Sequence, residues 1–364
     1  MIGHYRTVSS FVLTCSVGVS LNRNHIRKSK RVKARNGFYN SVGAIHRKRI
    51  TTMKNRKVIE NIQPFNDVYI SCYYSSLFPV INKFGKNILP FLLNNFVHIK
   101  YDKDMKKIIA ADDKIVSEEK LFSEQGLLIK KDAIGNDTAL DDIRFSIKNN
   151  SPVIVLIDSY FQRISCNTYL KKHSLHYLLI FGFDDQKQIL RINEHAFWES
   201  KKYDLFDWEY QEFLDAYNGA KLYQKNEEFS NLQIELKGSK RVENLFALER
   251  FLAYIQQNCD CIFQELNLLR DNISSLFYDY NNLQYVLDKY RKSKKAILYV
   301  LQRTENKSKK ELEEALIVLE KLWGLITKAL ITKQISARLS NKIEEVSFEF
   351  LEKDLVFYEN LLYK

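Results

Sequence analysis

The chain has 364 residues, too many for one ordinary domain and suitable for two, and its 45% hydrophobic and 27% charged residues are a globular balance. Only 11 glycines and 4 prolines argue against a collagen-like or low-complexity chain, and no apolar run approaches the length of a membrane-spanning helix. Five cysteines without framework spacing favour a reducing, cytoplasmic location over a disulfide scaffold, whereas the net charge of +12 at first suggests a nucleic-acid partner.

That charge belongs to a basic leader, residues 1–57. The leader contains 14 Lys and Arg and no acidic residue, which leaves 42 basic and 44 acidic residues, a net charge of −2, for residues 58–364. A near-neutral body removes the argument for a nucleic-acid partner. Three interpretations of the leader compete: an organellar transit peptide, a basic arm, and an unstructured extension upstream of a start at Met53, which we favour.

Residues 58–237 have the pattern of an α+β domain. The predicted helices cover residues 75–96 (two helices, or one broken at Pro79 and Pro90), 137–150 and 204–218. The predicted strands cover residues 97–101, 107–111, 152–158, 176–183, 188–193 and 229–236. Continuous apolar runs at 152–158 and 176–183 predict buried strands, and a hairpin turn at 184–187 joins the second of them to the next strand.

After Gly238 the pattern changes to that of long helices. Apolar residues from Leu245 to Tyr290 alternate at spacings of three and four without a break, which predicts one long helix with a coiled-coil-like seam. Two further series run from Leu312 to Leu330 and from Ile335 to Phe350. We therefore expect residues 238–364 to form an antiparallel bundle of long helices, with packing inside one chain favoured over a homodimer seam.

Cys72 is the first candidate for a reactive residue. It lies where the sequence turns apolar and helical, and the positive end of a helix dipole favours the nucleophilic thiolate. The plainer interpretation is a small buried side chain, which is the commoner use of a cysteine in an apolar segment.

His173 and His176 open one of the predicted buried strands. Two histidines three residues apart could hold a metal on a helix, but this stretch has the pattern of a strand and no nearby partner set, so we predict neither a metal nor a cofactor. A histidine at the start of a buried strand suits a general base, and a structural histidine satisfied by hydrogen bonds is the alternative.

Asn193 follows seventeen residues after His176, on the next strand of the predicted hairpin. A carboxamide there can accept the imidazole N–H and hold the ring in the reactive tautomer. Glu194 and His195 follow directly and are alternatives for the same role.

Two segments carry a resemblance to a known family. They are Pro152 to Phe161, which contains Asp-Ser-Tyr, and Tyr169 to Asp185, which contains His-Ser-Leu-His-Tyr and Gly-Phe-Asp-Asp. They resemble the N-terminal domain of the butirosin biosynthesis protein H family, which is similar in fold to papain-like and bacteriocin-processing cysteine peptidases. The resemblance covers roughly residues 60–235. The sequence departs from the family's pattern in the loop 162–168, which lacks proline and contains Cys166.

The resemblance implies a set of site residues. Carried over by position, Cys72 is the nucleophile, His176 the base and Asn193 the orienting residue. The candidates for substrate binding or an oxyanion hole are Gln63 and Asn66, upstream of Cys72, and Asp158, Tyr160 and His173 in the matching segments.

The resemblance also implies the reaction and its partners. The expected activity is transfer of an acyl group from an acyl carrier protein thioester to a small-molecule amine, in specialised-metabolite biosynthesis. A cysteine peptidase or amidase on the same fold and a non-catalytic scaffold protein of a biosynthetic cluster are the alternatives. Nine Lys and Arg against Glu305 alone in residues 289–310 suggest a docking face for an acidic carrier protein, and a solvated helix end is the plainer interpretation.

Overall fold

The computed structural model describes residues 55–363, apart from Asn136 and residues 196–201, 225–226, 274–278 and 334–335. The leader up to residue 54 therefore lies outside the described residues. Its predicted end at residue 57 differs from the structure, because Arg56–Val58 form strand β1, which pairs with the end of β6, Leu175–Asp184.

A seven-stranded antiparallel sheet forms the centre of the first part of the chain. Its strands run in the order β4-β9-β5-β6-β7-β8, with β1 beside β6. The bounds of the other strands are β4 Leu127–Lys131, β5 Val153–Asp158, β7 Ile189–His195, β8 Tyr203–Glu209 and β9 Asn231–Leu236. Strand β5 and most of β6 are fully buried, as their continuous apolar runs predict.

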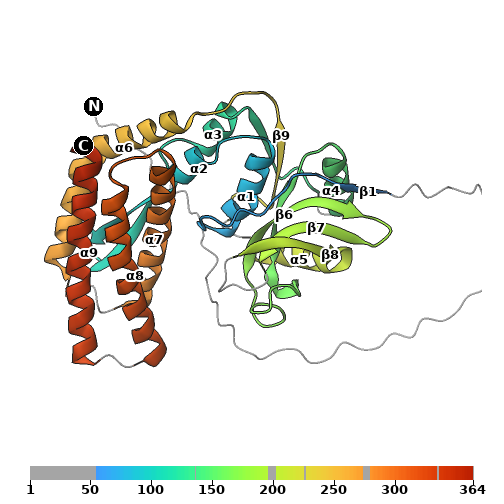
Figure 1. The fold of residues 1–364 in the computed structure, drawn as a ribbon. Helices are drawn as coiled ribbons and strands as arrows, with labels where there is room; N and C mark the ends of the chain where they lie inside the picture. The colour runs from blue at the N-terminus through green and yellow to red at the C-terminus, as the bar shows by residue number, and fades with distance from the viewer. Residues whose placement is uncertain are drawn as a thin grey trace, which may run out of the picture.

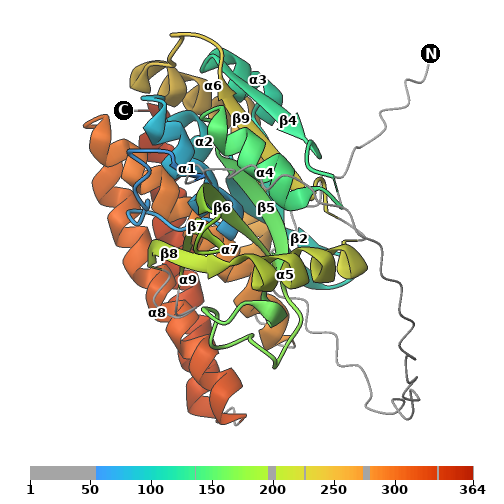
Figure 2. The ribbon, with the colours of Figure 1, turned by 90° about the vertical axis from the view of Figure 1, so that its right-hand side faces the viewer.

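Helices cover both faces of this sheet. The helix α1, Cys72–Lys83, packs on β6. The helix α4, Ala139–Lys148, packs on β5 and β6, the helix α5, Tyr210–Tyr223, packs on β5, and α4 and α5 touch each other. Figure 2 shows α4 and α5 in front of the sheet, with α1 and the long helices behind it. The sheet therefore separates the helix that begins at Cys72 from α4 and α5.

The elements of this part differ from the prediction in two ways. The predicted helix over 204–218 begins with strand β8, because Tyr203 and Trp208 are buried and the strand pairs along its length with β7. The short helix α3, Glu118–Glu124, and strand β4 have no counterpart in the prediction.

Four long helices follow, and the last three of them stand side by side in Figure 1, while the first runs across their upper end. They are α6 Asn244–Asp271, α7 Tyr280–Arg303, α8 Lys309–Thr332 and α9 Ala337–Tyr363. The predicted unbroken helix from Leu245 to Tyr290 is wrong, since α6 ends at Asp271 and Asp279 caps α7 by accepting a hydrogen bond from Asn282 N. Ile335, the start of the last predicted series, lies outside the described residues.

The helical region also holds a hairpin from the first half of the chain. Strands β2, Phe96–Asp102, and β3, Lys107–Asp113, pair with each other and pack on α6 and α7. The short helix α2, Leu89–Leu93, packs on the same two helices. None of the helices in the described part of the chain combines the length and apolar composition needed to cross a membrane.

The segment that leads to Cys72 is fastened to α7. The rings of Phe65 and Tyr299 pack edge to face, 5.9 Å apart, and Asp67 accepts hydrogen bonds from Tyr299 Oη and Arg303, each at 3.1 Å. Lys292 Nζ lies 5.2 Å from the ring centre of Tyr69. Helix α7 therefore fixes the path of the chain just before the candidate nucleophile.

A buried ion pair joins α7 to α9. Lys294 Nζ lies 2.6 Å from Asp354 Oδ1, and the two side chains are 1% and 0% exposed. The ammonium group also lies over the ring of Tyr358, and Tyr290 Oη donates a hydrogen bond to Asp354. Burial lowers the pKa of Lys294 to about 8, although Asp354 acts in the opposite direction.

This lowered pKa predicts a pH dependence of stability. Between pH 8 and the ordinary pKa of lysine, the unfolded chain holds the Lys294 proton and the folded chain releases it, so stability rises with pH in this window. We expect the wild type to gain roughly 1–3 kcal/mol of unfolding free energy relative to Lys294→Met as the pH rises from about 7 to 9.5. Urea unfolding of both proteins across this range measures the difference, and parallel curves would contradict it.

Candidate active site

Cys72 is the first residue of α1. Ser71 is the N-cap, with φ −155° and ψ 168°, and its hydroxyl accepts a hydrogen bond from Tyr74 N at 3.5 Å. The cysteine is 4% exposed and therefore sits, buried, at the positive end of the helix. That position favours the thiolate form.

His176 lies on β6 and faces this cysteine. Its Nε2 atom is 3.0 Å from Glu194 Oε1 and 2.9 Å from Oε2, and its imidazole hydrogen-bonds to the thiol of Cys72. Because Nε2 is engaged by the carboxylate, Nδ1 is the ring nitrogen left for the thiol. Cysteine, imidazole and carboxylate thus form one connected array.

Burial and charge act in opposite directions on this array. Burial would lower the pKa of His176, but the carboxylate of Glu194 and the thiol of Cys72 raise it to about 10. Burial would raise the pKa of Glu194, but His176 and His195 hold it well below its usual range. The folded protein therefore favours an imidazolium at His176 and a carboxylate at Glu194, beside the sulfur of Cys72.

A β-bulge decides which residue of β7 faces His176. Leu179 is opposite Asn193 and Gly182 is opposite Arg191, with a register shift between Ile180 and Gly182. Glu194 is consequently opposite residue 178 and shares a face with His176. Without the extra residue on β6, Asn193 would take that face.

In the structure the side chain of Asn193 contacts α1, which corrects its predicted role as the residue that orients the imidazole. Its Nδ2 atom donates a hydrogen bond to the backbone oxygen of Ser75, at 3.2 Å. That oxygen would ordinarily accept from the residue four positions later, but Pro79 has no N–H to donate. Asn193 thus completes the helix that begins at Cys72, and Glu194, one of the two alternatives, contacts the imidazole.

The carboxylate of Glu194 is fully buried and is held from several sides. It accepts hydrogen bonds from the backbone N of His195 at 2.7 Å and from Gln162 Nε2 at 3.1 Å, and His195 Nδ1 lies 2.5 Å from it. The two imidazoles that contact this carboxylate are those of His176 and His195. The sequence pattern singles out a different pair, His173 and His176, and does not indicate this contact.

The other predicted residues make contacts of their own. Asp158 Oδ2 is 2.6 Å from His173 Nδ1, and the imidazole stacks on Tyr160 with ring centres 4.2 Å apart. Asp158, His173 and Tyr160 are therefore in contact with one another, with the Tyr160 ring stacked on the imidazole that pairs with Asp158. Asn66 bonds to the backbone of Tyr203 through both ends of its amide, and Gln63 is exposed.

Tyr203, at the start of β8, was not predicted as a site residue. Its ring lies 5.0 Å from that of His195, and its pKa is raised well above the usual value by burial and then by Tyr69, Glu194 and Cys72. It therefore lies beside the thiol and the carboxylate. Its position in a stretch with helical apolar spacing conceals it in the sequence.

The predicted basic docking face is mostly neutralised. Lys294 is buried against Asp354, as described above, and acidic side chains also pair with Lys289, Arg291, Lys292, Lys295 and Arg303. The acids come largely from other segments, which a count over residues 289–310 does not include. The argument from charge for a carrier protein at this face is thereby removed.

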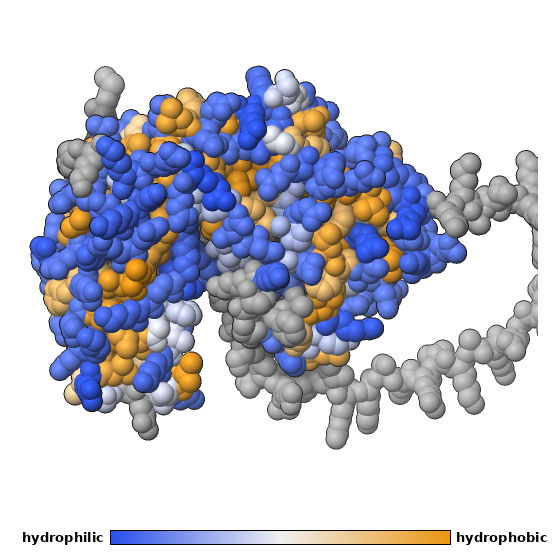
Figure 3. All heavy atoms as spheres, viewed as in Figure 1, coloured by the Kyte–Doolittle hydropathy of each residue, from blue (hydrophilic) through white to orange (hydrophobic). Residues whose placement is uncertain are grey.

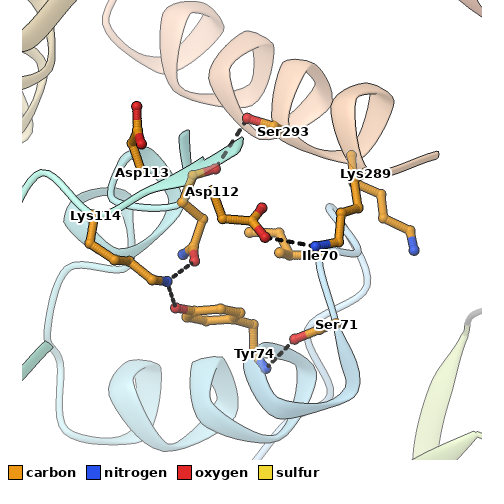
Figure 4. A pocket seen from close by; sticks show the side chains of 10 residues that line it. Ile70, Ser71, Tyr74, Asp112, Asp113, Lys114, Lys289 and Ser293 are labelled. Atoms are coloured by element: carbon orange, nitrogen blue, oxygen red, sulfur yellow. Dashed lines mark hydrogen bonds and ion pairs between the residues drawn. The ribbon is translucent and has the colours of Figure 1, made fainter. Parts of the chain in front are cut away.

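Two hollows flank the segment before Cys72. A small pocket of about 60 Å³ lies between the start of α1, β3 and α7 (Figure 4), where Lys114 bonds to Tyr74 and Lys289 to Asp112. A groove of about 920 Å³ is lined by residues 67–69, α7 and Trp323 of α8. The surface in Figure 3 is hollowed beside these long helices. The groove reaches to within three residues of the candidate nucleophile.

One comparison with known proteins agrees with the fold. The model of the Peptidase_C39 like family matches residues 95–224, which include His176 and Glu194 and begin after Cys72. A search of curated proteins finds no match. Over these residues the chain is similar to a family of the papain-like, cysteine-peptidase type, and the cysteine that completes the array comes from outside the matched part.

Proposed function

We propose that the protein is a thiol-dependent acyltransferase, with Cys72 as nucleophile, His176 as base and Glu194 as the residue that orients the imidazole. The observation that carries the proposal is the connected array, in which one imidazole contacts a helix-terminal thiol and a buried carboxylate. Such an array activates a nucleophile and returns the proton to a leaving group. In keeping with the family resemblance, the donor is an acyl carrier protein thioester and the acceptor a small-molecule amine of specialised metabolism.

The proposed reaction has two steps. The Cys72 thiolate attacks the donor carbonyl, a new carbon–sulfur bond forms, and the departing thiol takes its proton from His176. The acceptor amine next attacks the acyl-cysteine, gives a proton to His176, and displaces the Cys72 thiolate. The first-turn N–H groups of α1 lie at the helix end where the oxyanion develops.

Transfer to an amine requires water to be excluded, and the surroundings of Cys72 support this. The cysteine and His176 are both nearly fully buried. Next to Cys72, Tyr73 packs against the rings of Tyr177 and Phe229, each 5.7 Å away. An acyl-cysteine in this apolar setting is protected from bulk water until the acceptor arrives.

A cysteine peptidase or amidase is the second candidate. The match to a Peptidase_C39 like family favours it, because the same array would cleave an amide if water took the place of the amine.

The partition between the two products tests the proposal. The full chain is incubated with an acylated carrier protein, with and without a primary amine, and the amide and free acid are quantified by mass spectrometry. We expect amide as the main product with the amine present and no product from Cys72→Ala. Free acid alone would establish hydrolysis, and an untouched thioester would remove acyl transfer from this donor.

A further inference from the structure

We propose that His176, Glu194 and His195 form a binding site for a divalent transition-metal ion, with Zn²⁺ as the fitting ion. The three residues each offer one ligand atom, and these atoms lie within 4.8 Å of one another in the described part of the chain. Two imidazoles and one carboxylate are a donor set that Zn²⁺ takes in proteins.

The carboxylate of Glu194 already lies close to both imidazole nitrogens. Glu194 Oε1 lies 3.0 Å from His176 Nε2 and 2.5 Å from His195 Nδ1. Tetrahedral zinc with bonds of about 2.0–2.1 Å places its ligand atoms roughly 3.4 Å apart. The ion would replace the protons between the rings and the carboxylate, and the carboxylate oxygen would move away from each imidazole nitrogen by less than about 1 Å.

A separate observation provides the remaining coordination position. A cavity of about 50 Å³ lies against both histidines, and it is otherwise lined by small polar side chains: Ser159, Ser165, Asn167, Thr168 and Ser174. A cavity of this size holds at least one water molecule, and the hydroxyl groups are suitable partners for it. The ion would therefore have three protein ligands and a water.

The carboxylate is already held in place by groups outside the ligand set. Gln162 Nε2 donates to Glu194 Oε2 at 3.1 Å, and Gln162 Oε1 accepts from Ser165 Oγ at 2.7 Å. Gln162 is fully buried. Support of this kind orients a ligating carboxylate and increases metal affinity.

An ion at this site is incompatible with the base role of His176, an inference that rests on the proposed function. Acyl transfer needs Nδ1 of His176 to accept the proton of Cys72. A metal on Nε2 leaves the ring proton on Nδ1, so the imidazole has no lone pair for the thiol. The metal-loaded protein would therefore be an inactive form of the acyltransferase.

Metal binding is tested first, without reference to activity. Chelator-treated full chain, with Cys259 and Cys261 replaced by serine, is titrated with Zn²⁺ against a chromophoric chelator, and with Co²⁺ as a spectroscopic probe. We expect one equivalent bound, cobalt bands without thiolate charge transfer, and an affinity loss of roughly 100-fold or more in His195→Ala. Cys72→Ala and His173→Ala, whose imidazole pairs with a different carboxylate, should bind as before. Unchanged affinity in His195→Ala, or thiolate charge transfer lost in Cys72→Ala, would overturn the site.

Inhibition is tested second. One equivalent of Zn²⁺ should abolish amide formation by the Cys259/Cys261 serine protein, and a chelator should restore it. Zn²⁺ that binds at this site without slowing transfer would overturn the incompatibility. Metal binding in a protein that transfers no acyl group would overturn the proposed function and leave the metal site standing.

Discussion

We expect Glu194→Gln to slow the proposed acyl transfer by roughly 10³ to 10⁴-fold, because the carboxylate that would orient the imidazole becomes an amide. In the wild type, both oxygens of Glu194 lie within 3.0 Å of His176 Nε2. An amide can present its NH₂ group to the ring and so stabilise the wrong tautomer. It also no longer stabilises the imidazolium that protonates the leaving thiol.

Asn193→Ala is the matched control, because it changes the neighbouring side chain of the same strand. It removes the hydrogen bond to the Ser75 oxygen, so we expect a loss of stability of about 1–3 kcal/mol rather than a comparable loss of rate. Single-turnover kinetics of both variants, with thermal melts to confirm folding, compare the two effects. A large rate loss in Asn193→Ala together with an active Glu194→Gln would return the orienting role to the carboxamide.

We expect Asp354→Asn to destabilise the protein by about 3–5 kcal/mol, the cost of leaving one partner of a buried ion pair uncompensated. Lys294 is 1% exposed, and its ammonium group keeps the rings of Tyr290, Phe357 and Tyr358 as neighbours but no anion. The affected contact joins α7, which also holds the segment before Cys72, to α9. A fall in stability should therefore reach the candidate site.

A double-mutant cycle, with unfolding free energies measured in urea, isolates the interaction energy between Lys294 and Asp354. Lys294→Met leaves the fully buried carboxylate of Asp354 without its cation, so we expect this variant to be destabilised as well. The double variant has neither charge, and we expect it to lose less stability than Asp354→Asn does. A loss of less than about 1 kcal/mol of unfolding free energy in Asp354→Asn would show that the ion pair is solvated or contributes little to stability.

The sequence predicts best the elements whose pattern has one structural solution. Strands β5 and β6 are continuous apolar runs because both of their faces are covered. The sequence of β8 does not distinguish a strand from a helix, because Leu205 and Trp208 also fit a helical spacing. Only pairing with β7, a non-local contact, makes this segment a strand. The break after Asp271 is concealed because Ile273, Leu276 and Tyr280 keep the helical spacing across it.

The sequence predicts the cysteine and the histidine of the site and their order along the chain, but it does not predict the third residue, Glu194. Cys72 and His176 stand at element starts, which local patterns indicate. The choice between Asn193 and Glu194 depends on one extra residue in β6, because a shift of one position exchanges the two faces of a strand. Nothing in the sequence of β6 marks this bulge apart from Gly182 beside it, whereas Pro79 explains afterwards why an asparagine is useful at position 193.

The location of the acyl group tests the central claim most directly. The full chain is mixed with an acyl thioester donor in the absence of amine, quenched in acid, and its peptides are analysed by mass spectrometry. We predict a single acyl group on Cys72, released as amide when an amine is added before the quench, and strongly reduced in His176→Ala. An acyl group on the exposed Cys166 or Cys261 instead, or none on Cys72, would contradict the thiol array as the reactive centre.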